Sequence, residues 1–318
     1  MLILSQVDLI GLLPPGALIA PAESAALAAD QQCTPRRQHI EWNGNAFLTM
    51  PAVAPDLIGA KLVCVVPGNA TRNLPVTNGV MVLADGATGE PLAVLNAAAL
   101  TALRTGAVGA LGVKHMTPPD TGTLGIIGCG VQGAWQAISA AAVRPIREIF
   151  CVRRSAANYE RFVATIGAEA PQLRITPCVD ARELLEQTSL VIAATTSTQP
   201  VLPDDATLLA GRHFISIGSF RPTMQELPDA VYRLTAHIVI DSEAAREEVG
   251  DVIAPLEKGL VTSDNVFTIG QLISRQRTID VSGTTAYKSV GMALYDLHVA
   301  RALYAEATRR HVGREVAL

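Results

Sequence analysis

A glycine-rich turn between a strand-like and a helix-like segment constrains this chain more than any other feature. The turn, Gly128-Cys129-Gly130-Val131-Gln132-Gly133, follows the apolar run 123–127 and opens a helix-like run over 134–143. In such a turn the first glycine permits a tight bend, the second lets the backbone approach a pyrophosphate, and the third lets helix and strand pack closely. The helix N-terminus adds free N–H groups. We therefore expect a dinucleotide site that includes Gly128, Gly130, Val131, Gln132 and Gly133.

The chain after a Pro-Pro-Asp segment near residue 118 alternates strand and helix patterns. Short continuous apolar strands separated by helices are typical of a parallel sheet that is covered on both faces. We predict an α/β fold with a Rossmann-type doubly wound parallel sheet. The expected strands are 124–127, 149–152, 174–179, 190–194, 213–217 and 238–240, and the expected helices are 134–143, 156–166 and 181–187.

The first third of the chain has a different pattern. Turn signals at Asp85-Gly86 and Thr88-Gly89 separate strand-like runs and indicate an antiparallel sheet. Strands are expected at 63–66, 80–83 and 91–95, followed by a helix over 98–114, and the C-terminal run 289–310 is expected to form a long amphipathic helix. We predict a second, α+β substrate and dimerisation domain over 1–116, completed by 290–318, beside a dinucleotide-binding domain over 117–289.

The residues after the second strand of the predicted Rossmann domain indicate which cofactor is bound. NAD-binding units carry a carboxylate at this strand tip, which binds the ribose 2′-hydroxyl. This chain instead has Arg153, Arg154 and Ser155. Guanidinium groups are planar, fork-shaped partners for phosphate. We therefore predict NADP as the cofactor, with NAD as the alternative.

Composition limits the other classes of partner. The 318 residues carry a net charge of -4, and no apolar run is long enough to span a bilayer. Neither nucleic acid nor a membrane is expected as a partner. The cysteines, Cys33, Cys64, Cys129, Cys151 and Cys178, are scattered without a C-x-x-C pair, which favours reduced thiols in a cytoplasmic protein. No metal site is predicted.

Motifs along nearly the whole chain, taken together and in order, resemble the ornithine cyclodeaminase/mu-crystallin family. They are Pro35-Arg36-Arg37, Met50-Pro51-Ala52, Ala60-Lys61-Leu62-Val63, Thr88-Gly89-Glu90-Pro91, Leu100-Thr101-Ala102-Leu103-Arg104-Thr105, the turn at 128–132, Ala194-Thr195-Thr196-Ser197, Gly250-Asp251 and Lys288-Ser289-Val290-Gly291. The resemblance implies a Rossmann domain beside a substrate domain built from both chain ends. It also implies a homodimer that pairs through the substrate domains.

The resemblance also implies roles for individual residues. Arg37 and Arg104 match the family's substrate-carboxylate arginines, and Lys61 matches its active-site lysine, so that Lys61 and Arg104 are the expected catalytic residues. These side chains suit an α-imino acid, which needs a bidentate clamp for its carboxylate and a nearby proton source. Substrate contacts are further expected from Ser289 and Gly291, and cofactor contacts from Thr195, Thr196, Ser197, Ser219 and Val290. Asp296 is expected either near this site or as a buried partner of another helix.

Two departures from the cyclodeaminase pattern concern the substrate. Phe220 stands where the cyclodeaminases carry an aspartate, and Val76 stands where they carry a substrate-contacting threonine. A phenyl ring cannot act as a general base. Both changes make the expected site more apolar and count against cyclisation of ornithine.

The resulting expectation is an NAD(P)H-dependent oxidoreductase that reduces a ketimine or imino acid, such as 1-pyrroline-2-carboxylate, to the amino acid. Ornithine cyclodeaminase and an alanine- or opine-type dehydrogenase are alternatives within the same family. A non-catalytic, mu-crystallin-like ligand-binding protein is the alternative from another class. Retention of Lys61, Arg37 and Arg104 favours an enzyme.

Overall fold

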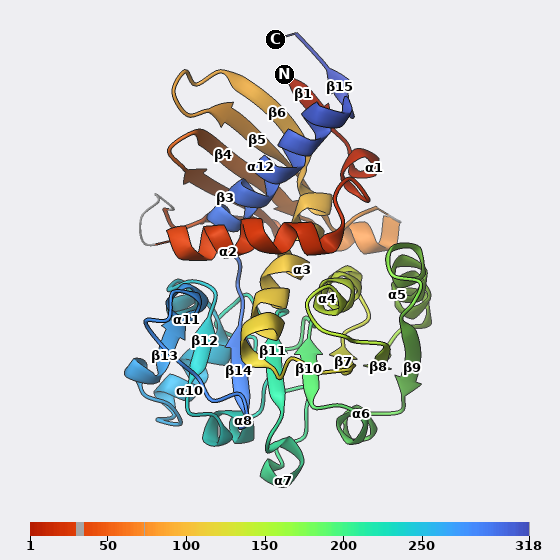
Figure 1. Ribbon diagram of the computed structural model, residues 1–318, viewed down its shortest axis with the longest axis vertical. Helices are drawn as coiled ribbons and strands as arrows, with labels where there is room; N and C mark the ends of the chain where they lie inside the picture. Colours follow the sequence, from red (N-terminus) through yellow and green to blue (C-terminus); the bar gives the residue numbers. More distant parts are fainter. Residues whose placement is uncertain (30–34, 73, 318) are drawn as a thin grey trace. The chain divides into compact units, whose positions relative to one another are not determined.

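The computed structural model describes residues 1–29, 35–72 and 74–317 (Figure 1). They form two compact units, one made of residues 1–104 and 292–318 and the other of residues 105–291. The domain boundaries expected from the sequence stay a prediction. Within the described ranges, no helix is long and apolar enough to cross a membrane.

The first unit is built on a seven-stranded sheet in the order β15-β1-β6-β5-β4-β3-β2. Neighbours from β2 to β6 are antiparallel, as predicted, whereas β1 runs parallel to β6. The strands are β1 (Leu2–Leu4), β2 (Gln38–Trp42), β3 (Asn45–Val53), β4 (Leu57–Val65), β5 (Thr77–Asp85), β6 (Pro91–Asn96) and β15 (Arg314–Glu315). The helical segments are α1 (Gln6–Leu9), η1 (Pro15–Leu18), α2 (Ile19–Ala28), η2 (Pro67–Arg72) and the C-terminal α12 (Ala293–Arg310).

Helix α12 covers one face of this sheet. It packs against β3, β4 and β5 and against α2 (Figure 1). Strand β4 shows why this face is buried: Leu57, Gly59, Lys61 and Val63 alternate with more exposed residues and point to the same side. A Cβ atom on Gly59 would lie 2.7 Å from Leu297 Cδ1 of α12, so a larger residue would force that side chain to shift. The helix therefore lies close to the strand that carries Lys61.

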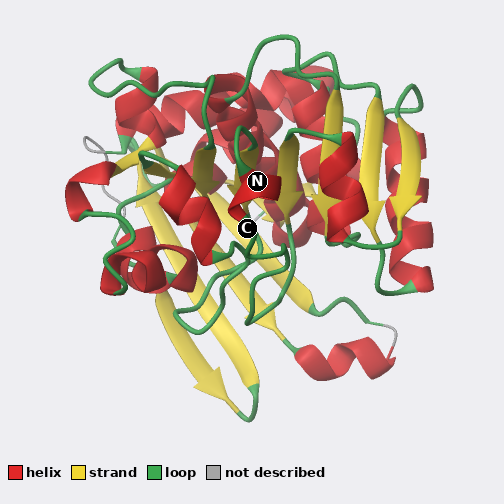
Figure 2. Ribbon diagram, turned by 90° about the horizontal axis from the view of Figure 1, so that it is seen from below, coloured by secondary structure: helices red, strands yellow, loops and turns green. Residues whose placement is uncertain are grey.

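The second unit is an eight-stranded sheet in the order β13-β12-β14-β11-β10-β7-β8-β9, and every neighbouring pair is parallel (Figure 2). The predicted doubly wound α/β fold is confirmed. The strands are β7 (Thr123–Ile127), β8 (Glu148–Val152), β9 (Arg174–Cys178), β10 (Leu190–Ala193), β11 (His213–Ser216), β12 (Ile238–Ile240), β13 (Val266–Thr268) and β14 (Thr285–Lys288). The helical segments after β7 are α4 (Val131–Ala141), α5 (Ala156–Glu169), α6 (Ala181–Gln187), α7 (Ala206–Leu209), α8 (Asp229–Leu234), α9 (Ala245–Glu248), α10 (Gly250–Glu257), η3 (Ser263–Asn265) and α11 (Ile269–Ile273).

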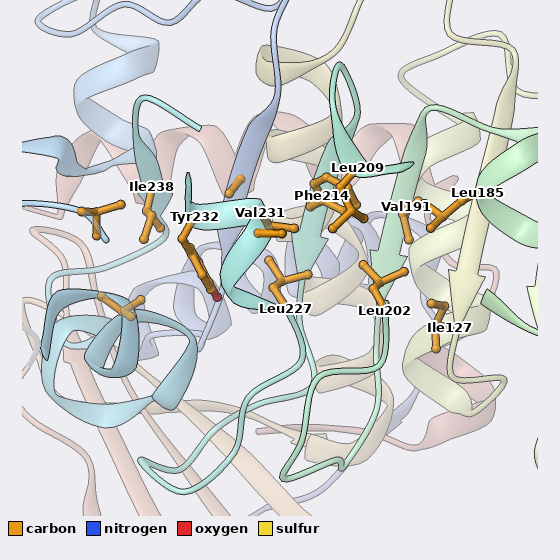
Figure 3. Packing of buried hydrophobic residues seen from close by; sticks show 14 of the residues in the cluster. Ile127, Leu185, Val191, Leu202, Leu209, Phe214, Leu227, Val231, Tyr232 and Ile238 are labelled. Atoms are coloured by element: carbon orange, nitrogen blue, oxygen red, sulfur yellow. The ribbon is translucent and has the colours of Figure 1, made fainter. Parts of the chain in front are cut away.

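One face of this sheet packs a continuous apolar core. Figure 3 shows Ile127, Val191, Phe214 and Ile238 of four strands beside side chains of the flanking segments, including Tyr232. Each apolar side chain buried in this way contributes about 1.5–3 kcal/mol to folding. This core supports the sheet on which the strands align. Ligands of such sheets bind at the edge formed by the carboxyl ends of the strands.

Helix α3 (Ala97–Met116) packs closely because of three glycines spaced three residues apart. A Cβ atom on Gly106 would lie 2.5 Å from Ser139 Oγ, one on Gly109 would lie 1.8 Å from Gln136 Oε1, and one on Gly112 would lie 2.3 Å from Tyr287. A side-chain carbon at any of these positions would force a neighbouring group to shift, because each of those separations is shorter than a normal Cβ contact. The backbone of α3 can therefore approach α4 and β14 directly.

One expectation about an element is wrong, and the strands β1, β2, β3, β13, β14 and β15 were not predicted. The C-terminal helix does not begin at residue 289, because 289–292 form the extended segment between β14 and α12. Strand β3 was not predicted, and its Pro51 argues against a central strand. The structure resolves this conflict: β2 pairs with residues 45–49 of β3, and among the described residues Pro51 has a strand neighbour on the β4 side only.

The described cysteines are free thiols: Cys64 is exposed, and Cys129, Cys151 and Cys178 are buried. Cys33 lies outside the described residues. Among those residues, no three His, Cys, Asp or Glu side chains form a group that could hold a metal ion.

Candidate functional site

The glycine turn of the second unit has the shape that a dinucleotide requires. Gly128 has a φ of +110°, and a Cβ atom there would lie 2.4 Å from the carbonyl oxygen of Ala194. A Cβ atom on Gly133 would lie 2.1 Å from the carbonyl oxygen of Gly128, whereas one on Gly130 would meet nothing within 4 Å. The turn is therefore tight at its first and third glycines and open at the second, where a pyrophosphate would approach. These residues fit a dinucleotide.

Helix α4 begins at Val131, within this glycine-rich stretch, with Gly130 as its N-cap and no side-chain cap. Its first N–H groups therefore remain available to an anion, and the helix dipole favours one there. Val131 is exposed at this end, and the Oε1 atom of Gln132 is buried without a hydrogen-bond partner within the described part of the chain. A buried polar atom without a partner costs free energy, so a ligand group that reached Gln132 would relieve that cost.

The three residues predicted to bind a 2′-phosphate follow β8. Ser155 caps α5, and its Oγ accepts a hydrogen bond from the Asn158 N–H at 3.4 Å. The Arg153 guanidinium lies over the ring of Tyr159, with Cζ 5.5 Å from the ring centroid. Arg153 and Arg154 are both exposed. Two guanidinium groups at this strand tip are consistent with a phosphate ligand, and no carboxylate occupies it.

The loops after β10 and β11 contain four more predicted cofactor residues. The Thr195 hydroxyl donates to Glu226 Oε1 at 2.8 Å, and the Ser219 hydroxyl donates to Asp251 Oδ2 at 2.5 Å. Ser197 donates to the carbonyl oxygen of Gln199, and Thr196 is exposed. The hydroxyl hydrogens of Thr195 and Ser219 are thus already donated to buried carboxylates.

A buried carboxylate at the end of β12, that of Asp241, binds all three residues of the segment 289–291. Asp241 Oδ2 accepts hydrogen bonds from the Ser289 hydroxyl at 2.7 Å and from the Gly291 N–H at 2.6 Å, and Asp241 Oδ1 accepts one from the Val290 N–H at 3.1 Å. Gly291 has a φ of +75°, in the left-handed region that favours glycine. The predicted contacts of these three residues with ligands stay a prediction.

The first unit brings Lys61, Arg104 and Asp296 together. The Lys61 ammonium on β4 donates to both carboxylate oxygens of Asp296, each at 2.8 Å, and Arg104 Nε on α3 lies 3.0 Å from Asp296 Oδ1. Lys61 is 2% exposed, Arg104 7% and Asp296 0%. These residues come from distant parts of the chain, and a buried carboxylate that touches both cations joins them. We call this group the cationic cluster, because it holds two cations and one anion.

Burial and the neighbouring charges of the cluster determine the pKa of Lys61. Burial lowers the pKa of the Lys61 ammonium from 10.5 to about 8, because the charged form loses its hydration. Asp296 opposes this shift and raises the pKa, while Arg104 and Arg37 lower it further. Lys61 is thereby mostly protonated at neutral pH and can lose its proton slightly above it.

Arg104 and Arg37 are the two arginines that lower the pKa of Lys61. Arg104 uses its Nε toward Asp296, and no partner is described for its two terminal nitrogens among residues 1–29, 35–72 and 74–317. Those nitrogens could clamp a carboxylate in a bidentate manner. Arg37 directly precedes β2, is half-buried, and lies near enough to Lys61 to affect its pKa.

The two residues that depart from the cyclodeaminase pattern are both accessible. Phe220 is 47% exposed in the loop after β11, with the Arg221 guanidinium 5.5 Å from its ring centroid. Val76 is 37% exposed just before β5. Neither side chain can accept or donate a proton.

Sequence reasoning missed the carboxylates that organise both units. Glu226, Asp241 and Asp251 were not selected as site residues, and Asp296 was left between two roles. A charged residue inside an otherwise apolar segment is the signal that could have found Asp296, which lies between Tyr295 and Leu297.

Comparison with known proteins agrees with this architecture. The model of the ornithine cyclodeaminase/mu-crystallin family matches residues 19–311. A Delta(1)-pyrroline-2-carboxylate reductase of Bacillus cereus is 36% identical over 309 residues, covering 92% of this chain and 94% of that protein.

Two solved structures extend the likeness to the whole fold. The Thermococcus litoralis Delta(1)-pyrroline-2-carboxylate reductase in complex with NADH and L-proline has a TM-score of 0.91 at 28% identity, covering 99% of this chain and 100% of that one. An archaeal alanine dehydrogenase dimer with bound NAD has a TM-score of 0.89 at 26% identity, covering 100% and 99% of the two chains. The chain described here belongs to the ornithine cyclodeaminase/mu-crystallin family.

Proposed function

We propose that this chain is an NAD(P)H-dependent imino-acid reductase that converts 1-pyrroline-2-carboxylate to proline. The observation that carries the proposal is the cationic cluster, in which two buried cations share one buried carboxylate. Relatives named for this reaction, at 36% identity, support the choice of substrate. The fit of the glycine turn to a dinucleotide supports the choice of reductant.

The charge of the cluster suits an anionic substrate. Lys61 and Arg104 carry two positive charges and Asp296 one negative charge, so the cluster has a net charge of +1 while Lys61 is protonated. An uncompensated buried charge is costly, and a bound carboxylate would neutralise it. In the proposal the terminal nitrogens of Arg104, with Arg37, clamp the substrate carboxylate.

Lys61 acts in this proposal as the proton source. Reduction of an imine adds a hydride to the imine carbon and a proton to the nitrogen. The cofactor, when bound, supplies the hydride. The Lys61 ammonium, with a pKa of about 8, can donate the proton near neutral pH, and Asp296 holds its Nζ in place.

NADPH is the preferred cofactor in this proposal. The support is the pair Arg153 and Arg154 together with Ser155 at the tip of β8, where NAD-binding units carry a carboxylate. The solved relatives contain NADH or NAD, so preference for the phosphorylated cofactor needs its own measurement.

We also propose that two copies pair through the open face of the first sheet. The face opposite α12 presents apolar side chains on adjacent strands, among them Phe47, Val53, Ile58 and Val80, each at least 36% exposed. A wide apolar patch of this kind marks an interaction surface. The dimeric alanine dehydrogenase supports a second copy of this chain as the occupant. A cytoplasmic location stays a prediction from the sequence.

A substrate panel tests the proposed reaction. Oxidation of NADPH and NADH is followed with 1-pyrroline-2-carboxylate, with 1-piperideine-2-carboxylate, and with pyruvate plus ammonia. The proposal expects turnover of the cyclic imines and little turnover of pyruvate. Turnover of pyruvate plus ammonia alone would indicate an alanine dehydrogenase, and absence of turnover with every substrate would favour a binding protein.

A further inference from the structure

Glu226 joins the two loops that follow β10 and β11. Its Oε1 accepts hydrogen bonds from the Thr195 N–H at 2.6 Å and the Thr195 hydroxyl at 2.8 Å. Its Oε2 accepts hydrogen bonds from the Gly218 N–H at 2.7 Å and the Ser219 N–H at 3.3 Å. A Cβ atom on Gly218 would lie 1.9 Å from the carbonyl oxygen of Thr195, so the two loops touch directly. One side chain therefore fixes the backbone of both loops.

Glu226 is itself held by a buried network. Asp251 accepts hydrogen bonds from the backbone N–H groups of Glu226 and Leu227, each at 3.0 Å, and from the Tyr232 hydroxyl at 2.9 Å. Ser216 lies between the two carboxylates at 2.8 Å from each, and the Lys288 ammonium donates to its Oγ at 3.0 Å. Glu226 is fully buried and cannot meet solvent.

The strand order places these loops at one end of a bound dinucleotide. In the sheet, β7 lies between β8 and β10, and β11 follows β10. The glycine turn after β7 suits the pyrophosphate, and the arginines after β8 suit the adenosine half. Since the molecule continues through the pyrophosphate, its nicotinamide half must extend to the other side, over the ends of β10 and β11.

We propose that Glu226 is a positioning residue for the nicotinamide half of the cofactor. It acts through the backbone of Thr195, Gly218 and Ser219 and does not touch the cofactor itself. This inference rests on the proposed use of NAD(P), and it concerns only one half of that ligand. The adenosine half would bind at the arginines after β8, without help from Glu226.

The substitution Glu226→Gln is unusually informative at this position. Each carboxylate oxygen accepts at least one backbone N–H, so the amide nitrogen of glutamine must face a donor in either orientation. Turning the side chain over does not relieve the conflict. A buried donor that faces another donor loses its hydrogen bond, which destabilises the conformation of the two loops.

The test compares a whole cofactor with its adenosine half. Dissociation constants of NADPH and of 2′,5′-ADP are measured by calorimetry for the unmodified chain and for Glu226→Gln. We expect NADPH to bind at least about tenfold more weakly to the variant, the order set by a lost buried hydrogen bond. We expect 2′,5′-ADP to bind equally well to both proteins, because the adenosine half does not depend on the two loops. General damage to the unit would instead weaken the binding of both ligands. NADH and AMP are measured in the same way.

Two further variants complete the design. Ser216→Ala removes a fully buried member of the network. It should weaken the binding of NADPH but not of 2′,5′-ADP, and by less than Glu226→Gln does. This variant tests the proposal if Glu226→Gln does not fold. Glu257→Gln removes an exposed carboxylate from α10, the helix that carries Asp251, and should change neither constant. Unchanged NADPH binding, or equal weakening of NADPH and 2′,5′-ADP, would overturn the role of Glu226 alone. Failure of the unmodified chain to bind either cofactor would overturn the proposed function together with this inference.

Discussion

Replacement of Asp296 by asparagine should disturb both the stability of the first unit and the chemistry of Lys61. Asp296 is fully buried, and it neutralises two cations at distances of 2.8 and 3.0 Å. Breaking a buried ion pair by removing one partner costs about 3–5 kcal/mol. The asparagine amide would also place a donor against Lys61 or Arg104. We therefore expect the free energy of unfolding to fall by about 3 kcal/mol in Asp296→Asn.

The same substitution should move the pH dependence of the reaction. Lys61 is protonated below its pKa of about 8, so kcat/KM for imine reduction should fall as the pH rises through 8 in the unmodified enzyme. Asp296 raises this pKa, and its loss should lower it, since the burial and the neighbouring arginines remain. In Asp296→Asn the fall in kcat/KM should therefore begin at a lower pH.

The assay is a pH–rate profile between pH 6 and about 10, combined with chemical unfolding of each variant. Asp56→Asn is the matched control: Asp56 forms an ion pair with Arg301 of α12, but its side chain is 66% exposed. An exposed pair contributes at most about 1 kcal/mol, so the control should keep both stability and pH profile. An Asp296→Asn enzyme with unchanged stability and an unchanged profile would show that Asp296 does not control the charge state of Lys61.

Three other predictions follow from the structure. Arg153→Asp should raise the KM for NADPH at least about tenfold, the order of one lost charged contact, and leave the KM for NADH nearly unchanged; equal KM values for both cofactors in the unmodified enzyme would contradict the assignment. Val80→Asp, on the open face of the sheet, should convert a dimer to a monomer in sedimentation experiments, whereas Val7→Asp on α1 should not. Incubation with ornithine and either cofactor should release no ammonia, since Phe220 cannot act as a general acid or base. Catalytic formation of proline from ornithine would show that Phe220 does not occupy the position of the cyclodeaminase aspartate.

Local signals were sufficient to predict six of the eight strands of the parallel sheet in the second unit, and they missed β13 and β14. Its strands are short apolar runs bounded by turns, and the glycine turn is tied to one strand and one helix, so β7, β10 and α6 lie within a few residues of their expected positions. Signals of this kind depend on neighbours in the sequence. They fail where the local residues favour a different structure from the observed one, as at Pro51 in β3 and at the extended residues 289–292.

The cationic cluster could be predicted only in part. The family resemblance selected Lys61 and Arg104, but the contact of both with Asp296 joins residues 235 and 192 positions apart and depends on how α12 lies on β4. Glu226 could not be selected either, because its role comes from three backbone N–H groups and not from any motif. Long-range packing of this kind leaves no periodic pattern in the sequence.

In the proposed reaction, hydride passes from the nicotinamide cofactor to the α-carbon of a cyclic imino acid. The most direct test uses NADPH that carries deuterium at both positions of its nicotinamide C4, with 1-pyrroline-2-carboxylate as substrate and mass spectrometry of the product. We predict proline that carries one deuterium, located at the α-carbon. Oxidation of the cofactor without formation of proline, or proline without deuterium, would contradict the claim.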